Sequence, residues 1–280
     1  MELNKVYCMD NLELLKKIPN ESIDLIYCDI LYNTGKKFKD YDDNLGTPQQ
    51  AMEWYRPRLV EMQRVLKNTG TLLIQCDINL VHYLKCFLDE ILIFKNDIIW
   101  TYNIQSRRTE ISNKHDNILR YVKTNSYVYN TQYKPYTEKT LKEYRYTNEK
   151  GEKCCRTCRR DKDGNKVYYY TPLREGASIT DVWDDINSLT QSAKERVGYN
   201  TQKPKKLLER IIKAFSNEGD IVADFFCGSG TSMVVAKELG RQYIGCDINS
   251  RAVEITNDRL NKVITNNQIL FELGDKNGQE

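Results

Sequence analysis

The chain has 280 residues, of which 40% are hydrophobic and 29% charged. This length suits one large domain or two small ones, and the composition is that of a globular protein, which excludes disorder over most of the chain. The apolar runs stop well short of the roughly 18 residues that a membrane span needs. Acidic Glu2 and Asp10 stand where a secretory signal would be basic and then apolar, so we expect a cytoplasmic protein without a membrane partner.

Charge is distributed unevenly along the chain. The net charge is only +3, too small to indicate a nucleic-acid partner by itself. Between Lys134 and Arg174, however, 12 Lys or Arg stand against six Asp or Glu. The nine cysteines form no disulfide framework that the sequence can identify, and we expect free thiols.

The first segment, Met1 to about Lys95, is predicted to alternate strands and helices as βαβ units do. Strands are expected at residues 23–28 and 71–76, and a third at 97–102. Thr47 and Pro48 are expected to open a helix that Gly70 ends, and a second helix should run from about 78 to 92.

The middle segment, about 103 to 200, is polar, basic and rich in tyrosine. Short strands are predicted at 118–123 and 127–130, with little sustained periodicity after them. We interpret the part from 124 to 179 as an insert. It separates two parts of one predicted domain, residues 1–123 and 180–280.

The last segment is predicted to return to regular α/β structure. In chain order we expect a helix at 203–215, a strand at 220–226, a helix at 231–239, a strand at 242–247 and a helix at 251–263. This order is half of a doubly wound sheet. The predicted fold class is therefore an α/β, Rossmann-like, mostly parallel doubly wound sheet with an insert.

A glycine turn stands between a predicted buried strand and a predicted helix, at Gly228-Ser229-Gly230. Glycines let the backbone approach a ligand closely, and Asp247 ends the next predicted strand, where it can accept from two ribose hydroxyls. Met233 replaces the third glycine of a dinucleotide site, and the Gly-Lys-Ser/Thr of a P-loop is absent. We therefore expect a ligand with a ribose and no pyrophosphate, although a plain tight turn is the alternative.

A second candidate site follows the predicted strand at 23–28, where Asp29 is followed three residues later by Tyr32. The carboxyl ends of strands in an open α/β sheet line one crevice, so both residues should face the same cleft as the glycine turn. A carboxylate and an aromatic ring suit a planar amine. The alternative is that Asp29 caps a loop and Tyr32 packs in the core.

Together these motifs resemble the S-adenosylmethionine-dependent DNA amino-methyltransferases of the beta order, which methylate adenine N6 or cytosine N4. Asp29-Ile30-Leu31-Tyr32 resembles the catalytic Asp-Pro-Pro-Tyr, and Phe226-Cys227-Gly228-Ser229-Gly230 the Phe-x-Gly-x-Gly cofactor motif. Three further segments are similar to family motifs. They are Asn200-Thr201-Gln202-Lys203-Pro204, Gly245-Cys246-Asp247-Ile248-Asn249 and His115-Asp116-Asn117-Ile118-Leu119.

The resemblance implies S-adenosylmethionine as the cofactor and double-stranded DNA as the partner, with a homodimer and a companion restriction endonuclease as further expectations. It implies that the carboxylate of Asp29 and the carbonyl of Ile30 hold the target amine while Tyr32 stacks on a flipped base. The cofactor residues that it implies are Asp10, Asp29, Thr201, Lys203, Asp224, Phe226, Cys227, Gly228, Ser229, Gly230, Thr231, Asp247 and Ile248.

One departure from the family pattern concerns the catalytic motif, because Ile30 and Leu31 replace both prolines. Ile30 keeps a backbone carbonyl, but the fixed φ of proline is lost. An acidic first residue favours adenine N6 over cytosine N4. The sequence leaves three alternatives open: N4-cytosine or RNA adenine methylation, a catalytically silent nucleic-acid-binding subunit, and a small-molecule methyltransferase.

The basic insert is predicted to be the target-recognition region, because Lys and Arg meet phosphates while aromatic rings stack or wedge. A solvated charged face is the alternative. Cys154, Cys155 and Cys158 supply only half of a zinc site, so no metal is expected. The predicted DNA-binding residues are Arg107, Arg108, Arg156, Arg159, Arg160, Lys162 and Lys166.

Overall fold

A computed structural model describes residues 2–38, 41–103, 109–199 and 201–263. The chain divides into two compact units, one formed by Met1–Asn130 with Asp181–Glu280 and the other by Thr131–Thr180. The expected insert, 124–179, begins seven residues before the second unit and ends one residue before its end. Among the described residues, no helix combines the length and the apolar character that crossing a membrane requires.

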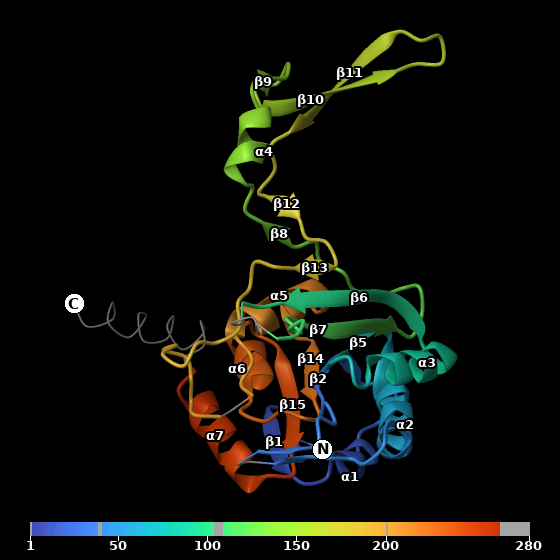
Figure 1. Ribbon diagram of the computed structural model, residues 1–280, viewed down its shortest axis with the longest axis vertical. Coiled ribbons are helices and arrows are strands. Elements are labelled where there is room, and N and C mark those ends of the chain that lie inside the picture. Colours follow the sequence, from blue (N-terminus) through green and yellow to red (C-terminus); the bar gives the residue numbers. More distant parts are fainter. Residues whose placement is uncertain (1, 39–40, 104–108, 200, 264–280) are drawn as a thin grey trace, which may run out of the picture. The chain divides into compact units, whose positions relative to one another are not determined.

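The first unit is built on an eight-stranded sheet with the order β1-β15-β14-β2-β5-β7-β6-β13 (Figure 1). Neighbouring strands from β1 to β5 run parallel, whereas β7 is antiparallel to both β5 and β6. The strands are β1 (Lys5–Cys8), β2 (Ile23–Asp29), β5 (Leu66–Cys76), β6 (Ile93–Thr101), β7 (His115–Val122), β13 (Val182–Trp183), β14 (Ile221–Asp224) and β15 (Gln242–Asp247). A separate two-stranded ribbon pairs β3 (Lys36–Lys37) with β4 (Asp42–Asp43). The sheet is the mostly parallel α/β sheet that the sequence predicts.

Helices lie on both sides of this sheet (Figure 1). One layer holds α1 (Asn11–Leu15), α2 (Pro48–Val65) and α3 (Val81–Ile91), and the other α5 (Lys205–Phe215), α6 (Thr231–Glu238) and α7 (Ser250–Asn261). The long helix α2 begins where the sequence predicts it, because Thr47, the N-cap directly before Pro48, forms a capping box with Gln50 in the first turn. Its apolar stripe, including Tyr55 and Leu59, is buried against the sheet.

Two predicted elements are wrong. Gly70 does not end α2, which stops at Val65; it lies within β5, where a Cβ would come within 3.0 Å of the Asp24 carbonyl oxygen. The run 127–130 forms no strand. The Val128 amide instead donates to the Thr69 carbonyl of β5 at 3.2 Å and the Asn130 amide to the Ala214 carbonyl of α5 at 2.8 Å, so this segment ties the sheet to the end of α5.

The second unit contains more regular structure than the sequence pattern predicts. Its elements are β8 (Tyr133–Lys134), α4 (Glu138–Glu143), β9 (Tyr146–Thr147), β10 (Lys153–Arg160), β11 (Lys166–Pro172) and β12 (Ala177–Ser178). β10 and β11 form an antiparallel hairpin. The Asp161 side chain accepts from the backbone amides of Asp163 and Asn165, and Gly164 adopts a φ of 84°, which together define the tight turn.

The centre of the large sheet is a topological switch point. β2 and β14 are neighbours, and the chain leaves β2 through α2 toward β5 but leaves β14 through α6 toward β15, on the opposite side. Adjacent loops therefore diverge above the carboxyl ends of β2 and β14. In open α/β sheets this is where a ligand crevice forms.

Candidate active site

A cavity of about 370 Å³ opens at this switch point. Asp29 ends β2, Asp224 ends β14 and Asp247 ends β15, and all three line the cavity. Almost every predicted catalytic and cofactor residue lines it as well, with Gly230 the exception. The cavity holds Asp10, Asp29, Ile30, Tyr32, Thr201, Lys203, Asp224, Phe226, Cys227, Gly228, Ser229, Thr231, Asp247 and Ile248.

The glycine turn is braced from behind by α7. Gly228 and Gly230 have φ values of 50° and 72°, in the left-handed region that other residues rarely adopt. The Thr256 hydroxyl donates to the Gly228 carbonyl at 3.1 Å, and Arg259 donates to the Ser229 carbonyl. A Cβ on Gly230 would overlap the Thr256 side chain. The turn is therefore fixed on its α7 side.

Asp247 is held at the end of β15 in a way that leaves acceptor capacity. Its carboxylate accepts from the backbone amides of Gly228 and Asn249, each at 2.9 Å. Burial raises the pKa of Asp247 despite these hydrogen bonds. A carboxylate has about four acceptor positions, so two are left for ligand hydroxyls.

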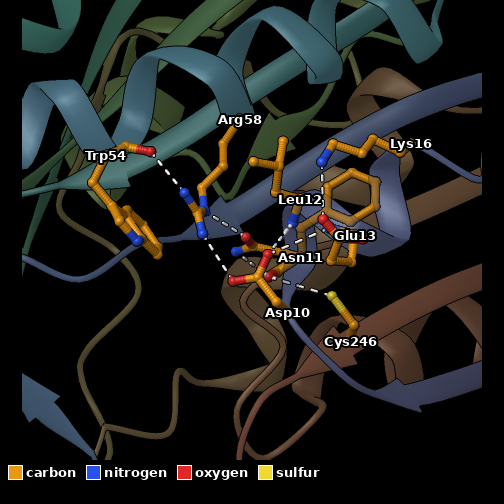
Figure 2. Close-up of polar contacts among 9 residues, drawn as sticks. Asp10, Asn11, Leu12, Glu13, Lys16, Trp54, Arg58 and Cys246 are labelled. Carbon is orange, nitrogen blue, oxygen red and sulfur yellow. Dashed lines mark hydrogen bonds and ion pairs between the residues drawn. The ribbon is translucent and has the colours of Figure 1, made fainter.

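Asp10 is fixed from two directions (Figure 2). It caps α1, accepting from the Leu12 amide at 2.8 Å, and its second oxygen accepts from Arg58 at 2.8 Å. Arg58 is buried, also donates to Asn11 at 2.6 Å, and lies 3.5 Å from the centre of the Trp54 ring. Arg58 and Trp54 were not predicted as site residues. They stand one turn apart on α2 and carry no motif.

Next to Asp10 the cavity wall is apolar. Trp54 and Phe226 pack edge to face with ring centroids 6.0 Å apart, and both line the cavity. Ile248, beyond β15, is exposed and lines it too. A planar heterocycle suits such a wall, with Asp10 available at its edge.

Asp224 is a buried carboxyl group beneath the glycine turn. It accepts from the Phe226 amide at 3.0 Å and from the Ser232 hydroxyl. Burial is the largest cause that raises its pKa, to about 7, and hydrogen bonds from Ser232 and Phe226 only partly oppose it. The folded chain therefore favours the protonated form of Asp224.

This shift predicts a pH dependence of stability. A raised pKa in the folded state means that the contribution of Asp224 is fully present below about pH 4 and is lost as the pH rises toward 7. In Asp224→Asn, the amide oxygen can still accept from Phe226 and its nitrogen can donate to Ser232. We expect the variant to gain thermal stability relative to the parent between pH 4 and 8, measured by melting both in one buffer series. A constant difference across this range would contradict the raised pKa.

Asp29 forms an ion pair with Lys203, whose Nζ lies 2.6 Å from Asp29 Oδ2. The two side chains are 19% and 14% exposed. Burial raises the pKa of Asp29, and the Lys203 charge lowers it without cancelling the effect of burial. Lys203 directly precedes Pro204, the N-cap of α5, so this helix fixes the position of the lysine.

The loop after Asp29 is held without prolines. The Ile30 amide donates to the Gln75 carbonyl at 3.2 Å, a hydrogen bond that proline could not make. The Tyr55 hydroxyl donates to the Leu31 carbonyl at 2.8 Å. These bonds supply part of the restraint that the missing prolines would give.

Tyr32 follows this loop, and its hydroxyl lies between two carboxylates. It is 2.8 Å from Asp29 Oδ1 and 2.9 Å from Asp116 Oδ2. Lys203 Nζ lies 5.3 Å from the centre of the ring. Asp116 belongs to the segment 115–119 that resembles a family motif, and no role was predicted for it.

The predicted DNA-binding residues occupy two parts of the chain. Arg156, Arg159, Arg160, Lys162 and Lys166 all lie on the β10–β11 hairpin or its turn. Arg107 and Arg108 lie outside the described residues. The same holds for Asn200, the first residue of the segment that resembles the Thr-x-Lys-Pro motif. In the described part of the chain, no group of three or more His, Cys, Asp or Glu side chains could hold a metal ion.

The fold and the cavity define a Rossmann-like α/β protein with a nucleoside-sized site at its switch point. The family described as DNA methylase, of the N6/N4 methyltransferase type, matches residues 23–258. The chain belongs to this family.

Individual relatives agree. The Type II methyltransferase M.HpaI of Haemophilus parainfluenzae is 33% identical over 260 residues, covering 91% of this chain and 74% of the relative. The DNA adenine methyltransferase YhdJ of Escherichia coli (strain K12) is 30% identical over 260 residues, covering 90% of this chain and 80% of the relative.

Solved structures share the fold at low identity. The M1.HpyAVI complex with SAM has a TM-score of 0.60 at 22% identity, covering 92% of this chain and 98% of that one. The cytosine-N4-specific PvuII DNA methyltransferase has a TM-score of 0.63 at 17% identity, covering 94% and 87%. At these identities the likeness bears on the fold alone.

Proposed function

We propose that the chain transfers the methyl group of S-adenosylmethionine to the N6 amine of an adenine flipped out of duplex DNA. The observation that carries the proposal is that one cavity joins the Asp29-Tyr32 pair to the glycine turn and Asp247. The family relationship supports DNA methylation. The acidic side chain of Asp29 and the similarity to the adenine methyltransferase YhdJ favour adenine.

The cavity fits S-adenosylmethionine in size and in donor set. Its volume of about 370 Å³ is in the range of small-molecule sites. Asp247 would accept from the ribose hydroxyls, Trp54 and Phe226 would flank the adenine ring, and Asp10 would accept from its amine. Bound there, the cofactor supplies an electrophilic methyl group on a positively charged sulfur, and the carboxylate of Asp29 suits that charge.

The residues of the chain would hold the target amine for attack. Asp29 and the Ile30 carbonyl would accept its two hydrogens, which turns the nitrogen lone pair away from the base ring. The new bond forms between this nitrogen and the methyl carbon, while the carbon–sulfur bond breaks and its electron pair stays on sulfur. The methylated nitrogen then loses one proton, which Asp29 would accept because it would already hold one of the amine hydrogens.

Product analysis tests this function. The purified chain is incubated with S-adenosylmethionine and DNA free of methylated bases, the DNA is digested, and the nucleosides are quantified by mass spectrometry. N6-methyladenine is the expected product. N4-methylcytosine would overturn the adenine assignment alone, whereas cofactor and DNA binding without either product would overturn the catalytic proposal in favour of a silent DNA-binding subunit.

The β10–β11 hairpin is proposed as a DNA-binding element. Arg156 pairs with Tyr170 across the ladder, and its guanidinium lies 4.4 Å and 4.6 Å from the ring centres of Tyr146 and Tyr168. The arginine is therefore ordered between the half-buried ring of Tyr146 and the exposed ring of Tyr168. Cations ordered in this way meet phosphates at a small entropic cost, and the exposed ring of Tyr169 is placed to stack on a base.

Replacing the five predicted DNA-binding cations of the hairpin by glutamine tests this element. The variant changes Arg156, Arg159, Arg160, Lys162 and Lys166. Each lost phosphate contact lowers the slope of log K against log salt by about 0.9, so we expect the slope for DNA binding to fall by roughly 3 to 5. A charge-matched control changes five other cations of the same unit to glutamine: Lys139, Lys142, Arg145, Lys150 and Arg174. Equal slopes for the two variants would show a general charge effect and contradict a hairpin interface.

The homodimer and the companion restriction endonuclease that the sequence resemblance implies stay predictions.

A further inference from the structure

A second buried carboxylate lies one hydroxyl group away from Asp29. Asp116 stands near the start of β7, is 5% exposed, and takes no part in the methyl transfer described above. β7 is the antiparallel strand beside β5. Asp116 thus reaches the site from a part of the sheet that supplies none of the predicted catalytic residues.

Three donors fix the Asp116 carboxylate. Tyr102 donates to Oδ1 at 2.9 Å, Gln75 donates to Oδ2 at 2.8 Å, and the Tyr32 hydroxyl lies 2.9 Å from the same Oδ2. Gln75 is oriented in turn by Tyr27, which donates to its amide oxygen at 2.6 Å. A buried carboxylate with this many partners has a defined position, because the hydrogen bonds offset the cost of burying its charge.

The single hydroxyl hydrogen of Tyr32 indicates a function for Asp116. The Tyr32 hydroxyl carries one proton but lies within hydrogen-bond distance of two carboxylates, Asp29 Oδ1 and Asp116 Oδ2. The other oxygen of Asp29 is already bound to Lys203. While Tyr32 donates to Asp29, each oxygen of Asp29 already accepts from one donor, so only part of the acceptor capacity of Oδ1 is left for a substrate.

We propose that Asp116 is a positioning residue for methyl transfer, which accepts the Tyr32 hydroxyl when the target amine binds and so leaves Asp29 Oδ1 open to that amine. The same hydrogen bond holds the Tyr32 ring in place for the base. The inference rests on the proposed function, in which Asp29 accepts from the amine. No proton leaves the site in this exchange, because the hydroxyl hydrogen only turns from one carboxylate to the other.

A carboxylate that merely braced the sheet would behave differently. Its removal would weaken folding and cofactor binding together, and its effect would not depend on the Tyr32 hydroxyl. A positioning role acting through Tyr32 has to disappear once that hydroxyl is gone. The two roles are therefore separated by a double-mutant cycle.

The cycle uses Asp116→Asn, Tyr32→Phe and the double variant. Asparagine keeps the shape of the side chain, and its oxygen can still accept from Tyr32 and Gln75. Without the charge, this oxygen is a weaker acceptor than the Asp29 carboxylate, so the Tyr32 hydroxyl should stay on Asp29. We expect Asp116→Asn to lower kcat by about 10- to 100-fold with little change in the Kd for S-adenosylmethionine. In the Tyr32→Phe background the same change should have no further effect on kcat.

Asp89→Asn is the matched control, because Asp89 also accepts from a tyrosine hydroxyl, that of Tyr121 at 2.7 Å, and does not line the cavity. It should leave kcat unchanged. Additive losses in the double variant, an unchanged kcat in Asp116→Asn, or a parallel loss of cofactor affinity would overturn the inference.

A readout without turnover separates this inference from the proposed function. The Asp116 charge raises the pKa of Asp29, so Asp116→Asn should lower that pKa in a carbon-13 NMR titration of the carboxyl groups, and Asp89→Asn should not. If the parent methylates no DNA but the Asp29 pKa responds as expected, the proposed function fails while the coupling stands. If the pKa does not move, the coupling itself is refuted.

Discussion

Asp29→Asn should lower the kcat of methyl transfer by at least about 100-fold, with a change of only a few-fold in the KM for DNA. An amide keeps the shape of the side chain but carries no negative charge where positive charge grows on the attacking nitrogen. Its nitrogen would also face either the Lys203 ammonium or the Tyr32 hydroxyl in place of an acceptor. Single-turnover rates with saturating S-adenosylmethionine measure the effect directly.

Asp24, near the start of β2, provides the control for Asp29 at the end of this strand. Asp24, on β2, binds Lys67 at 2.8 Å and accepts from the Ile221 amide at 2.9 Å, far from the cavity lining. Asp24→Asn should leave kcat within about twofold, although the loss of a largely buried charge should cost about 1 to 3 kcal/mol of stability. If the two variants lose activity equally, the loss reflects damage to β2 and Asp29 has no special role.

The sequence predicted the parts of the site that follow local rules. The glycine turn and Asp247 could be placed because a buried apolar run, a turn and a helix follow each other within a few residues. Asp29 could be placed because it ends such a run. Parallel strands in an open sheet bring their carboxyl ends together, so three separate motifs could be expected at one crevice.

Contacts made by unpatterned residues could not be predicted. Asp116 reaches Tyr32 across 84 residues, and Arg58 reaches Asp10 across 48. Neither contact leaves a periodic signal, since each depends on which strands become neighbours and on how α2 packs. The position of β7 between β5 and β6 brings Asp116 to the site, and the sequence alone did not fix that order.

The architecture of the insert could not be predicted from sequence periodicity either. Its arginines lie on β10 and three consecutive tyrosines lie on β11, and such exposed strands lack the apolar alternation that marks a half-buried strand. The short turn around Gly164 was the better signal, because Asp and Gly at a chain reversal favour a hairpin. Composition alone predicted a basic region and missed its architecture.

The loss of both prolines after Asp29 has less consequence in the structure than the motif suggests. Proline restrains φ but has no amide hydrogen, whereas Ile30 donates to β5 and is itself 5% exposed. Burial and hydrogen bonding thus restrain the loop by another route. This favours an active enzyme over a silent relative.

Gly230→Ala should abolish measurable binding of S-adenosylmethionine and destabilise the fold by about 2 to 4 kcal/mol. A left-handed φ costs an L-residue roughly 1 to 2 kcal/mol, and the added methyl group would overlap Thr256 on α7. Relief of that overlap requires the glycine turn or α7 to move, and the turn forms the floor of the proposed cofactor site. Calorimetric titration and thermal melting measure the two effects.

Gly219→Ala separates the cost of backbone conformation from the cost of the overlap. Gly219 has a φ of 83°, lies between α5 and β14, and has no atom within 4 Å of an added Cβ. This variant should lose only the conformational part, about 1 to 2 kcal/mol, and should bind S-adenosylmethionine as the parent does. If Gly230→Ala behaves the same way, α7 does not brace the turn, and the close approach of Thr256 has no part in forming the site.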